Sequence, residues 1–331
     1  MEPCKLGFGP MSRESIRALA TYSKTHDVPL MVIASRNQVD CAEVGGGYVG
    51  DFTTQTFADY VRSLGAPRLQ LCRDHSGPYL HKDDAGLSLD EAMARTVQSL
   101  KADIDAGFNL LHIDASACGI DEKRVAAHLF ESAIDYAGDR PVEFEYGSED
   151  NVGIAASVKT FKRDVEFALR YVKPRFVVGQ TGSLVRSVHQ RGKFAPDRVR
   201  DLVRVAEEHG VGLKEHNADY LTKDEIAQRW ELGVSALNIA PELGVRQTRT
   251  VRSLAIKHGL LRDWNDFGEA VIASGRATKW RADNKSDHIL AGGHYLYTSD
   301  AYQTLVGDLA KECDIDSEVQ KALLAVIARY H

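Results

Sequence analysis

Residues 68–78 read RLQLCRDHSGP, and the apolar alternation of a strand stops there at an adjacent aspartate and histidine. Gly77 and Pro78 follow, and a Gly-Pro dipeptide is a strong turn signal. The segment therefore predicts a short buried strand over 67–72 that is followed by two titratable side chains, Asp74 and His75. Two such groups at the end of a buried strand indicate a site rather than a simple loop.

Short apolar runs alternate with amphipathic stretches along most of the chain, which is typical of β-α units around a parallel sheet. Capping boxes at Ser88-Leu-Asp-Glu91 and Thr222-Lys-Asp-Glu225 mark two helix starts. No Gly-x-Gly-x-x-Gly directly follows a predicted strand, which disfavours a dinucleotide-binding fold. The eight predicted strands are Lys5 to Phe8, Pro29 to Ala34, Pro67 to Cys72, Asn109 to Asp114, Pro141 to Tyr146, Arg175 to Gly179, Val211 to Glu215 and Ala236 to Ala240.

Eight strand-helix units predict an α/β fold of the (β/α)8 TIM-barrel type over residues 1–257. Residues 258–331 predict a helical C-terminal extension packed on the barrel. Within it, the Gly-rich aromatic segment HILAGGHYLYTSD, 288–300, predicts a loop that reaches the barrel mouth.

Composition argues against several classes of protein. The net charge of -6 is mild, and scattered lysines and arginines predict neither a nucleic-acid surface nor a membrane surface. The five cysteines lack any C-x-x-C, which argues against a disulfide framework or structural zinc. No run approaches the ~18 apolar residues of a membrane span, and the N-terminus has no apolar h-region. We therefore expect a soluble, unprocessed, cytoplasmic protein.

The C-terminal ends of barrel strands converge on one face, so polar residues far apart in sequence meet there. His75 and His216 directly end the third and seventh predicted strands. Two imidazoles and a carboxylate from the fifth strand would form an open divalent-metal site. A single histidine inside a strand run is more often structural, and His112 is interpreted in this way.

Asp74 is well placed to move a proton of a metal-bound substrate, because it adjoins a predicted ligand. The alternative is a carboxylate that only orients His75. Asp114 and Asn238 could bind substrate hydroxyls or water, or could be buried polar plugs of the barrel.

These residues resemble a known family, the class II metal-dependent ketose-bisphosphate aldolases. The most similar branch is the accessory, non-catalytic subunit of tagatose-bisphosphate aldolase, and the resemblance runs from about residue 7 to 250. The segments that carry it, in order, are VPLMVIASRNQVD (28–40) with GGGYVGDFT (45–53), RDHSGP (73–78), HIDAS (112–116), YGSED (146–150) and EHNADYLT (215–222).

The resemblance implies roles for individual residues. It implies Asp74 as the catalytic acid/base, His75 and His216 as metal ligands, and Asn238 as a substrate contact. Glu145 resembles a glutamate near the metal in the wider family and is predicted as the third ligand. Glu149 matches the accessory branch and is predicted as a reserve ligand and second catalytic residue.

The chain also departs from the family pattern. The wider family has a third histidine after strand six, where this chain has Gln180, so the metal would need Glu145 or the Gln180 amide. Zinc is the expected ion, with manganese or another divalent ion as the alternative. The Gly-rich phosphate loop after strand seven is missing, so a phosphate would meet amides near 182–183 or Arg186 and Arg246. The predicted substrate contacts are Asn37, Asp114, Gln180, Asn238, Arg246 and His294.

The sequence thus predicts a divalent-metal-dependent enzyme acting on a sugar or a sugar phosphate. Aldolase-type and epimerase-type reactions both fit, because they share a metal-stabilised enediolate or alkoxide with Asp74 as acid/base. One alternative is a non-catalytic accessory subunit that binds a second, tagatose-bisphosphate-type aldolase subunit. Another is a sugar-binding module without catalysis. Barrels of this type often self-associate, and a homo-oligomer is expected.

Overall fold

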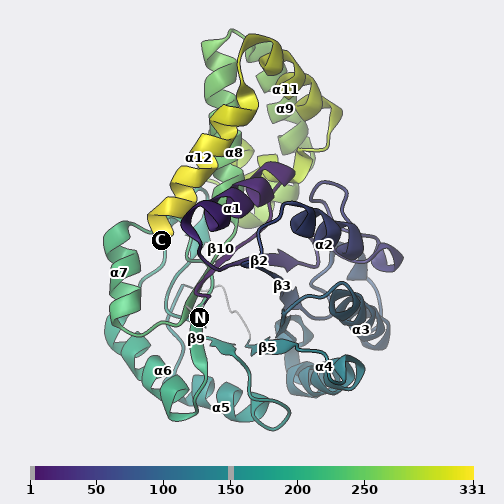
Figure 1. The fold of residues 1–331 in the computed structure, drawn as a ribbon, viewed down its shortest axis with the longest axis vertical. Coiled ribbons are helices and arrows are strands. Elements are labelled where there is room, and N and C mark those ends of the chain that lie inside the picture. The colour runs from purple at the N-terminus through teal and green to yellow at the C-terminus, as the bar shows by residue number, and fades with distance from the viewer. Residues whose placement is uncertain (1–3, 148–152) are drawn as a thin grey trace.

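The computed structural model describes residues 4–147 and 153–331. Its centre is a closed barrel of parallel strands in the order β1-β10-β9-β6-β5-β4-β3-β2 (Figure 1). The predicted TIM barrel is confirmed, and each predicted strand range overlaps one barrel strand. The barrel strands are β1 (Leu6–Phe8), β2 (Leu30–Ser35), β3 (Leu69–Ser76), β4 (Leu110–Ile113), β5 (Glu143–Tyr146), β6 (Phe176–Val178), β9 (Gly212–Glu215) and β10 (Ala236–Ile239).

Amphipathic helices surround the barrel, and two of them begin at the predicted capping boxes. In both predicted capping boxes, the Ser88 or Thr222 hydroxyl accepts a hydrogen bond from the backbone N–H three residues later. A short hairpin, β7 (Val185–Arg186) and β8 (His189–Gln190), follows β6. The surrounding helices are α1 (Arg13–His26), α2 (Thr54–Ser63), α3 (Leu89–Asp105), α4 (Glu122–Ala137), α5 (Val158–Ala168), α6 (Pro196–Glu208), α7 (Lys223–Glu231) and α8 (Pro241–Lys257).

The C-terminal part is helical, as predicted, while the exact boundary at residue 257 stays a prediction. Figure 1 shows α9 and α11 outside the ring of barrel helices, at the top of the view, and α12, in yellow, returning beside α8 and α1. The Tyr330 ring packs edge-on against Phe8 of β1, with centroids 6.0 Å apart. The elements are α9 (Leu261–Ala273), η4 (Arg276–Trp280), α10 (Lys285–Gly292), η5 (Gly293–Leu296), α11 (Asp300–Glu312) and α12 (Ile315–Tyr330).

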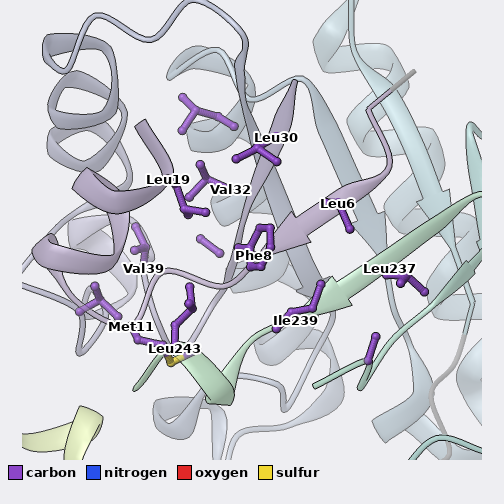
Figure 2. Close-up of a cluster of buried hydrophobic side chains, with 14 of the residues drawn as sticks. Leu6, Phe8, Met11, Leu19, Leu30, Val32, Val39, Leu237, Ile239 and Leu243 are labelled. Atoms are coloured by element: carbon purple, nitrogen blue, oxygen red, sulfur yellow. The ribbon is translucent and has the colours of Figure 1, made fainter. Parts of the chain in front are cut away.

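Two apolar layers lie on the two faces of the barrel strands. Figure 2 shows the outer layer, where Leu30 and Val32 of β2 meet Leu19 of α1. Successive strand residues point to opposite faces, so Met31 and Ile33 face the barrel interior. The interior cluster contains Cys4, Met31, Ile33, Cys72, Leu110, Phe176 and Ala236. In the described ranges no helix is both long and apolar enough to cross a lipid bilayer.

Strand β3 is longer than predicted, because it continues through the charged residues to Ser76. Arg73 does not end the strand, since its guanidinium is fully buried against Asp103, with Nη2 2.5 Å from Oδ1. The register with β4 shifts between Arg73 and Ser76, and His75 has a positive φ of 49°. Such a bulge interrupts the regular alternation. Asp74 and His75 can therefore both face the barrel mouth.

The turn after this bulge has no room for a side chain. A Cβ on Gly77 would lie 1.5 Å from the carbonyl oxygen of Asp114. We predict that Gly77→Ala lowers the free energy of unfolding by about 3 kcal/mol, because backbone has to move. Gly307→Ala in α11 is the control, since a Cβ there meets nothing within 4 Å. Urea denaturation of both variants measures the difference, and equal midpoints would contradict the prediction.

Candidate metal centre and active site

Three imidazoles meet at the C-terminal mouth of the barrel. His75 comes from β3, His112 from β4, and His216 directly follows β9. Their ring centroids lie 5.1 to 5.2 Å apart, and one ligand nitrogen from each ring lies within 4.8 Å of the others. His75 and His216, 141 positions apart in the chain, thus lie within ligand distance of one cation, as their predicted places at strand ends require.

His112 is the member that sequence reasoning interpreted as structural. Its Nε2–H donates to the carbonyl oxygen of Gly147 at 3.0 Å, and its Nδ1 accepts from the backbone N–H of His75 at 3.2 Å. These two backbone partners fix the neutral tautomer with its lone pair on Nδ1, on the side of His75. A cation bound there would replace the long 3.2 Å hydrogen bond. The signal for His112 was its strand position, two residues after the inward-facing Leu110.

Asp114 orients His75. Its Oδ2 lies 2.7 Å from His75 Nδ1, and its Oδ1 accepts from the backbone N–H of Ser116 at 2.9 Å. Burial would raise the pKa of Asp114, but the hydrogen bond and charge of His75 hold it well below its usual range. A carboxylate that accepts from Nδ1–H leaves Nε2 of His75 for a metal. This geometry favours a supporting role for Asp114 over the predicted substrate contact.

Asp74 lies against all three imidazoles. Its Oδ1 is 3.7 Å from His112 Nδ1 and 3.9 Å from His216 Nε2, and its Oδ2 is 3.7 Å from His75 Nε2. Burial would raise the pKa of Asp74, but the neighbouring imidazoles, His75 foremost, hold it well below the usual range. The amide of Asn238 lies 3.3 Å from Oδ1. Asp74 is therefore an ionised carboxylate at the edge of the imidazole group.

Glu145 lies deeper in the barrel than predicted for a ligand. Its Oε2 is 2.5 Å from the ammonium of Lys214, and its Oε1 is 2.7 Å from His216 Nε2. Burial opposes ionisation, but Lys214, His112 and His216 together lower the pKa of Glu145 to about 2. The group with metal-ligand spacing contains His112 in place of Glu145. Lys214 was also missed, although it precedes His216 by two residues and so shares its inward face.

The predicted substrate contacts divide between two cavities. Asn37, Asn238 and His294 line the mouth cavity of about 760 Å³, together with Asp74 and both predicted histidine ligands. The side chain of Asn37 also joins the loop after β3, through Leu80 O at 2.7 Å and Lys82 N at 2.9 Å.

Arg246 lies away from the mouth cavity and lines a separate cavity of about 340 Å³ on α8 and α12. It points outward from α8, whereas the mouth cavity lies at the strand ends. Gln180 follows β6 and is half-buried, and its carbonyl accepts from Ala156 N at 2.8 Å. It does not line the mouth cavity. Glu149 lies outside the described residues.

The donor set at the mouth fits a divalent cation. Three imidazole nitrogens with an adjacent carboxylate resemble catalytic sites that keep one position for water or substrate. Nitrogen ligands suit zinc and the later first-row metals better than calcium or magnesium. The hydrogen bonds from His75 to Asp114 and from His112 to Gly147 supply the outer partners that fix ring orientation in such sites.

Comparison with known proteins relates this barrel to a family. A family model described as D-tagatose-1,6-bisphosphate aldolase subunit GatZ/KbaZ-like matches residues 12–134. The D-tagatose-1,6-bisphosphate aldolase subunit GatZ of Escherichia coli O157:H7 is 25% identical over 294 residues, which span 76% of this chain and 68% of that protein. The resemblance to the tagatose-bisphosphate aldolase subunit branch is confirmed.

Solved structures share the fold of this chain. A probable tagatose 6 phosphate kinase from Sinorhizobium meliloti 1021 is 18% identical, with a TM-score of 0.82 over 99% of both chains. The YdjI aldolase from Escherichia coli K12 is 12% identical, with a TM-score of 0.58 over 99% of this chain and 91% of that chain. A fructose-bisphosphate aldolase from Campylobacter jejuni, 12% identical, has a TM-score of 0.57 over 99% and 89%. At these identities the likeness shows a common fold.

Removal of His112 tests which residue completes the nitrogen group. We predict that His112→Ala weakens binding of Zn²⁺ by more than about 100-fold, beyond the loss typical of a residue that only supports a ligand. His128→Ala on α4 is the control, since this ring is exposed and hydrogen-bonds Ser132. Competition with a chromophoric chelator measures both affinities. Unchanged zinc affinity in His112→Ala would restore Glu145 as the third ligand.

Loss of the Asp114 carboxylate tests the support of His75. We predict that Asp114→Asn weakens Zn²⁺ binding by about 10- to 100-fold, because the amide accepts the His75 Nδ1–H bond less strongly. The smaller effect, relative to His112→Ala, follows from leaving all three nitrogens in place. The same chelator competition measures it. An effect as large as that of His112→Ala would indicate that Asp114 itself binds the ion.

Proposed function

We propose that this chain is a divalent-metal-dependent enzyme that converts a sugar at the barrel mouth. The observation that carries the proposal is the position of Asp74, whose carboxylate lies within 3.9 Å of a ring nitrogen of all three imidazoles. A proton-transfer group beside a candidate metal site, in a cavity of about 760 Å³, is the arrangement that sugar chemistry next to a carbonyl requires.

Each residue has a distinct role in the proposal. His75, His112 and His216 hold the ion, with zinc as the first choice and manganese as the alternative. A divalent ion there polarises a substrate carbonyl or hydroxyl oxygen. Asp74 is ionised because the imidazoles lower its pKa, so it accepts a proton from the substrate and later returns it.

The buried pair of Lys214 and Glu145 supports this arrangement. The ammonium of Lys214 balances the Glu145 carboxylate, whose other oxygen meets His216. The Lys214–Glu145 pair therefore fixes the position of His216 through its Nε2 atom. The side-chain amide nitrogen of Asn238 lies 3.1 Å from the same Nε2. Two polar contacts leave little freedom for the ring. We propose a positioning role for Glu145 and Lys214 rather than ligation.

Aldol cleavage and epimerisation both fit the site. In cleavage Asp74 takes the proton of a substrate hydroxyl, and in epimerisation it takes a proton from carbon next to the carbonyl. Turnover in deuterated water separates the two reactions. Epimerisation removes a proton from the carbon that is inverted, so deuterium appears at that carbon and the sugar keeps its length. The proposal covers both reactions, and a sugar phosphate is included among its substrates.

A second candidate is a non-catalytic subunit of a tagatose-bisphosphate-type aldolase. The relative from Escherichia coli is named as an aldolase subunit, and the family model carries the same description. In this candidate the chain binds a second aldolase subunit, and the mouth residues stabilise the barrel. Purification without added chelator separates the candidates: a stoichiometric divalent ion supports the enzyme, and a metal-free chain bound to another aldolase subunit supports the accessory role.

Asp74→Asn is the direct test of the enzyme. We predict that the variant keeps its metal, because the three nitrogens remain, but loses turnover of D-tagatose 1,6-bisphosphate or D-tagatose by about 10²- to 10⁴-fold, the range of general acid–base catalysis. Asp121→Asn, which removes a surface partner of Arg124, is the matched control. Wild-type turnover by Asp74→Asn, or no turnover by the metal-loaded wild type, would overturn the proposal.

A further inference from the structure

The mouth cavity has two chemically different sides. Imidazoles and carboxylates of the barrel strands form one side. The C-terminal part forms the other with cationic and aromatic side chains, from η4 and η5. These lining residues are Arg276, Lys279, Trp280, His294 and Tyr295. The helical extension is therefore part of the cavity. Segment 288–300 reaches the mouth, as predicted, but through η5, which follows α10, rather than through a loop.

The two cations of this side have no carboxylate partner. No Asp or Glu oxygen among residues 4–147 and 153–331 lies within 4.0 Å of the Arg276 or Lys279 nitrogens. Lys82, the other lysine of the cavity, differs because its ammonium is 2.9 Å from Asp83. Most buried or half-buried arginines of this chain are paired, as Arg36, Arg73 and Arg229 show. Unpaired cations that line a cavity indicate an anion from outside the chain.

Aromatic rings hold both cations in place. The Arg276 guanidinium lies 5.0 Å from the Tyr48 ring centroid and 4.8 Å from that of Tyr295. The Lys279 ammonium lies 4.5 Å from the Trp280 ring and 5.7 Å from that of Tyr295. Cation–π contacts stabilise the charges without neutralising them. The Arg276 fork therefore stays available for two parallel hydrogen bonds to one anion.

His294 reports the positive field on this side. Burial, followed by the charges of Lys279 and Arg276, lowers the pKa of His294 to about 3. The imidazole is therefore neutral and adds no third charge, while it can still exchange a hydrogen bond with a ligand. The same field that opposes protonation of His294 attracts a negative group.

We propose that Arg276 and Lys279 form a subsite for an anionic end group, phosphate or carboxylate, of the sugar. The proposal rests on the proposed function for the other end of the ligand, which places the carbonyl at the three imidazoles. The subsite comes from the C-terminal part and the imidazoles from the barrel. A ligand that reaches from the imidazoles to the subsite therefore needs a negative charge at the end remote from its carbonyl.

A second cationic cavity is a weaker choice. It lies beside the β7–β8 hairpin and is lined by Arg186, Arg191, Lys193 and Arg281. Arg191 is already paired with Asp283 at 2.8 Å, and all four cations are exposed to water. Lys279 of the mouth cavity is also exposed, but Arg276 is half-buried there, and water screens a half-buried charge less than the four exposed ones. The mouth subsite also adjoins the reacting centre.

Binding calorimetry with three matched sugars tests the subsite. The probes are D-tagatose 6-phosphate, the acid obtained by oxidising C6 of D-tagatose to a carboxylate, and D-tagatose itself. We predict that the metal-loaded wild type binds one anionic probe at least about tenfold more tightly than D-tagatose, the gain of one charge-assisted hydrogen bond. The tighter of the two anionic probes identifies the end group.

Charge removal gives the decisive comparison. Arg276→Gln and Lys279→Gln should each lower affinity for that probe about tenfold and leave affinity for D-tagatose unchanged. Lys285→Gln on α10, which removes an exposed partner of Glu269, is the control and should bind as the wild type does. Equal binding of the anionic probe by all three variants, or no preference in the wild type, would overturn the subsite.

Metal content keeps this test separate from the proposed function. Arg276→Gln retains stoichiometric metal if only the subsite is altered, because η4 supplies none of the three imidazoles. Loss of anion preference in a chain that shows no turnover would support the subsite and contradict the enzyme. Turnover with unchanged anion preference in Arg276→Gln would support the enzyme and contradict the subsite.

Discussion

The alternation of side chains along eight parallel strands is the constraint on which the structure depends. Within the closed barrel every second residue faces one interior. Cys72, Leu110 and Ala236 form part of its apolar layer. Two residues later the same strands carry Asp74, His112 and Asn238, which lie together at the mouth. The core and the site are thus consecutive layers of one periodic arrangement.

Strand β3 breaks this periodicity at the point where the site needs it. Regular alternation would turn His75 away from the interior, because Asp74 already faces it. The register shift and the positive φ of His75 bring both residues to the mouth. A non-glycine residue in this region costs about 1–3 kcal/mol. Hydrogen bonds from His75 to Asp114 and to His112 offset that strain, so the strain and the candidate site are coupled.

The fold was predictable from the sequence because it repeats. Each apolar run in 1–257 contributed one barrel strand, and errors at strand ends did not change the topology. The site was predictable only in part. Asp74, His75 and His216 stand out beside turns, whereas His112 and Lys214 lie within apolar strand runs and show themselves only through alternation.

Two predicted site residues have other neighbours in the structure than the sequence suggested. Glu145 was expected at the metal, but a buried lysine two residues before His216 binds its carboxylate. Arg246 was expected near the substrate, but its position on α8 turns it toward α12 and a different cavity. Neither packing relation is encoded in the local pattern around the residue. Both depend on how a neighbouring element is rotated about its axis.

The electrostatic balance of the mouth connects the imidazoles with the opposite cations. Asp74, Asp114 and Glu145 bring three carboxylates to the mouth, and Lys214 balances one of them. A divalent ion held by the imidazoles would balance the other two. Arg276 and Lys279 would then leave the mouth with an excess of positive charge. An anionic ligand neutralises this positive charge, whereas a neutral sugar does not.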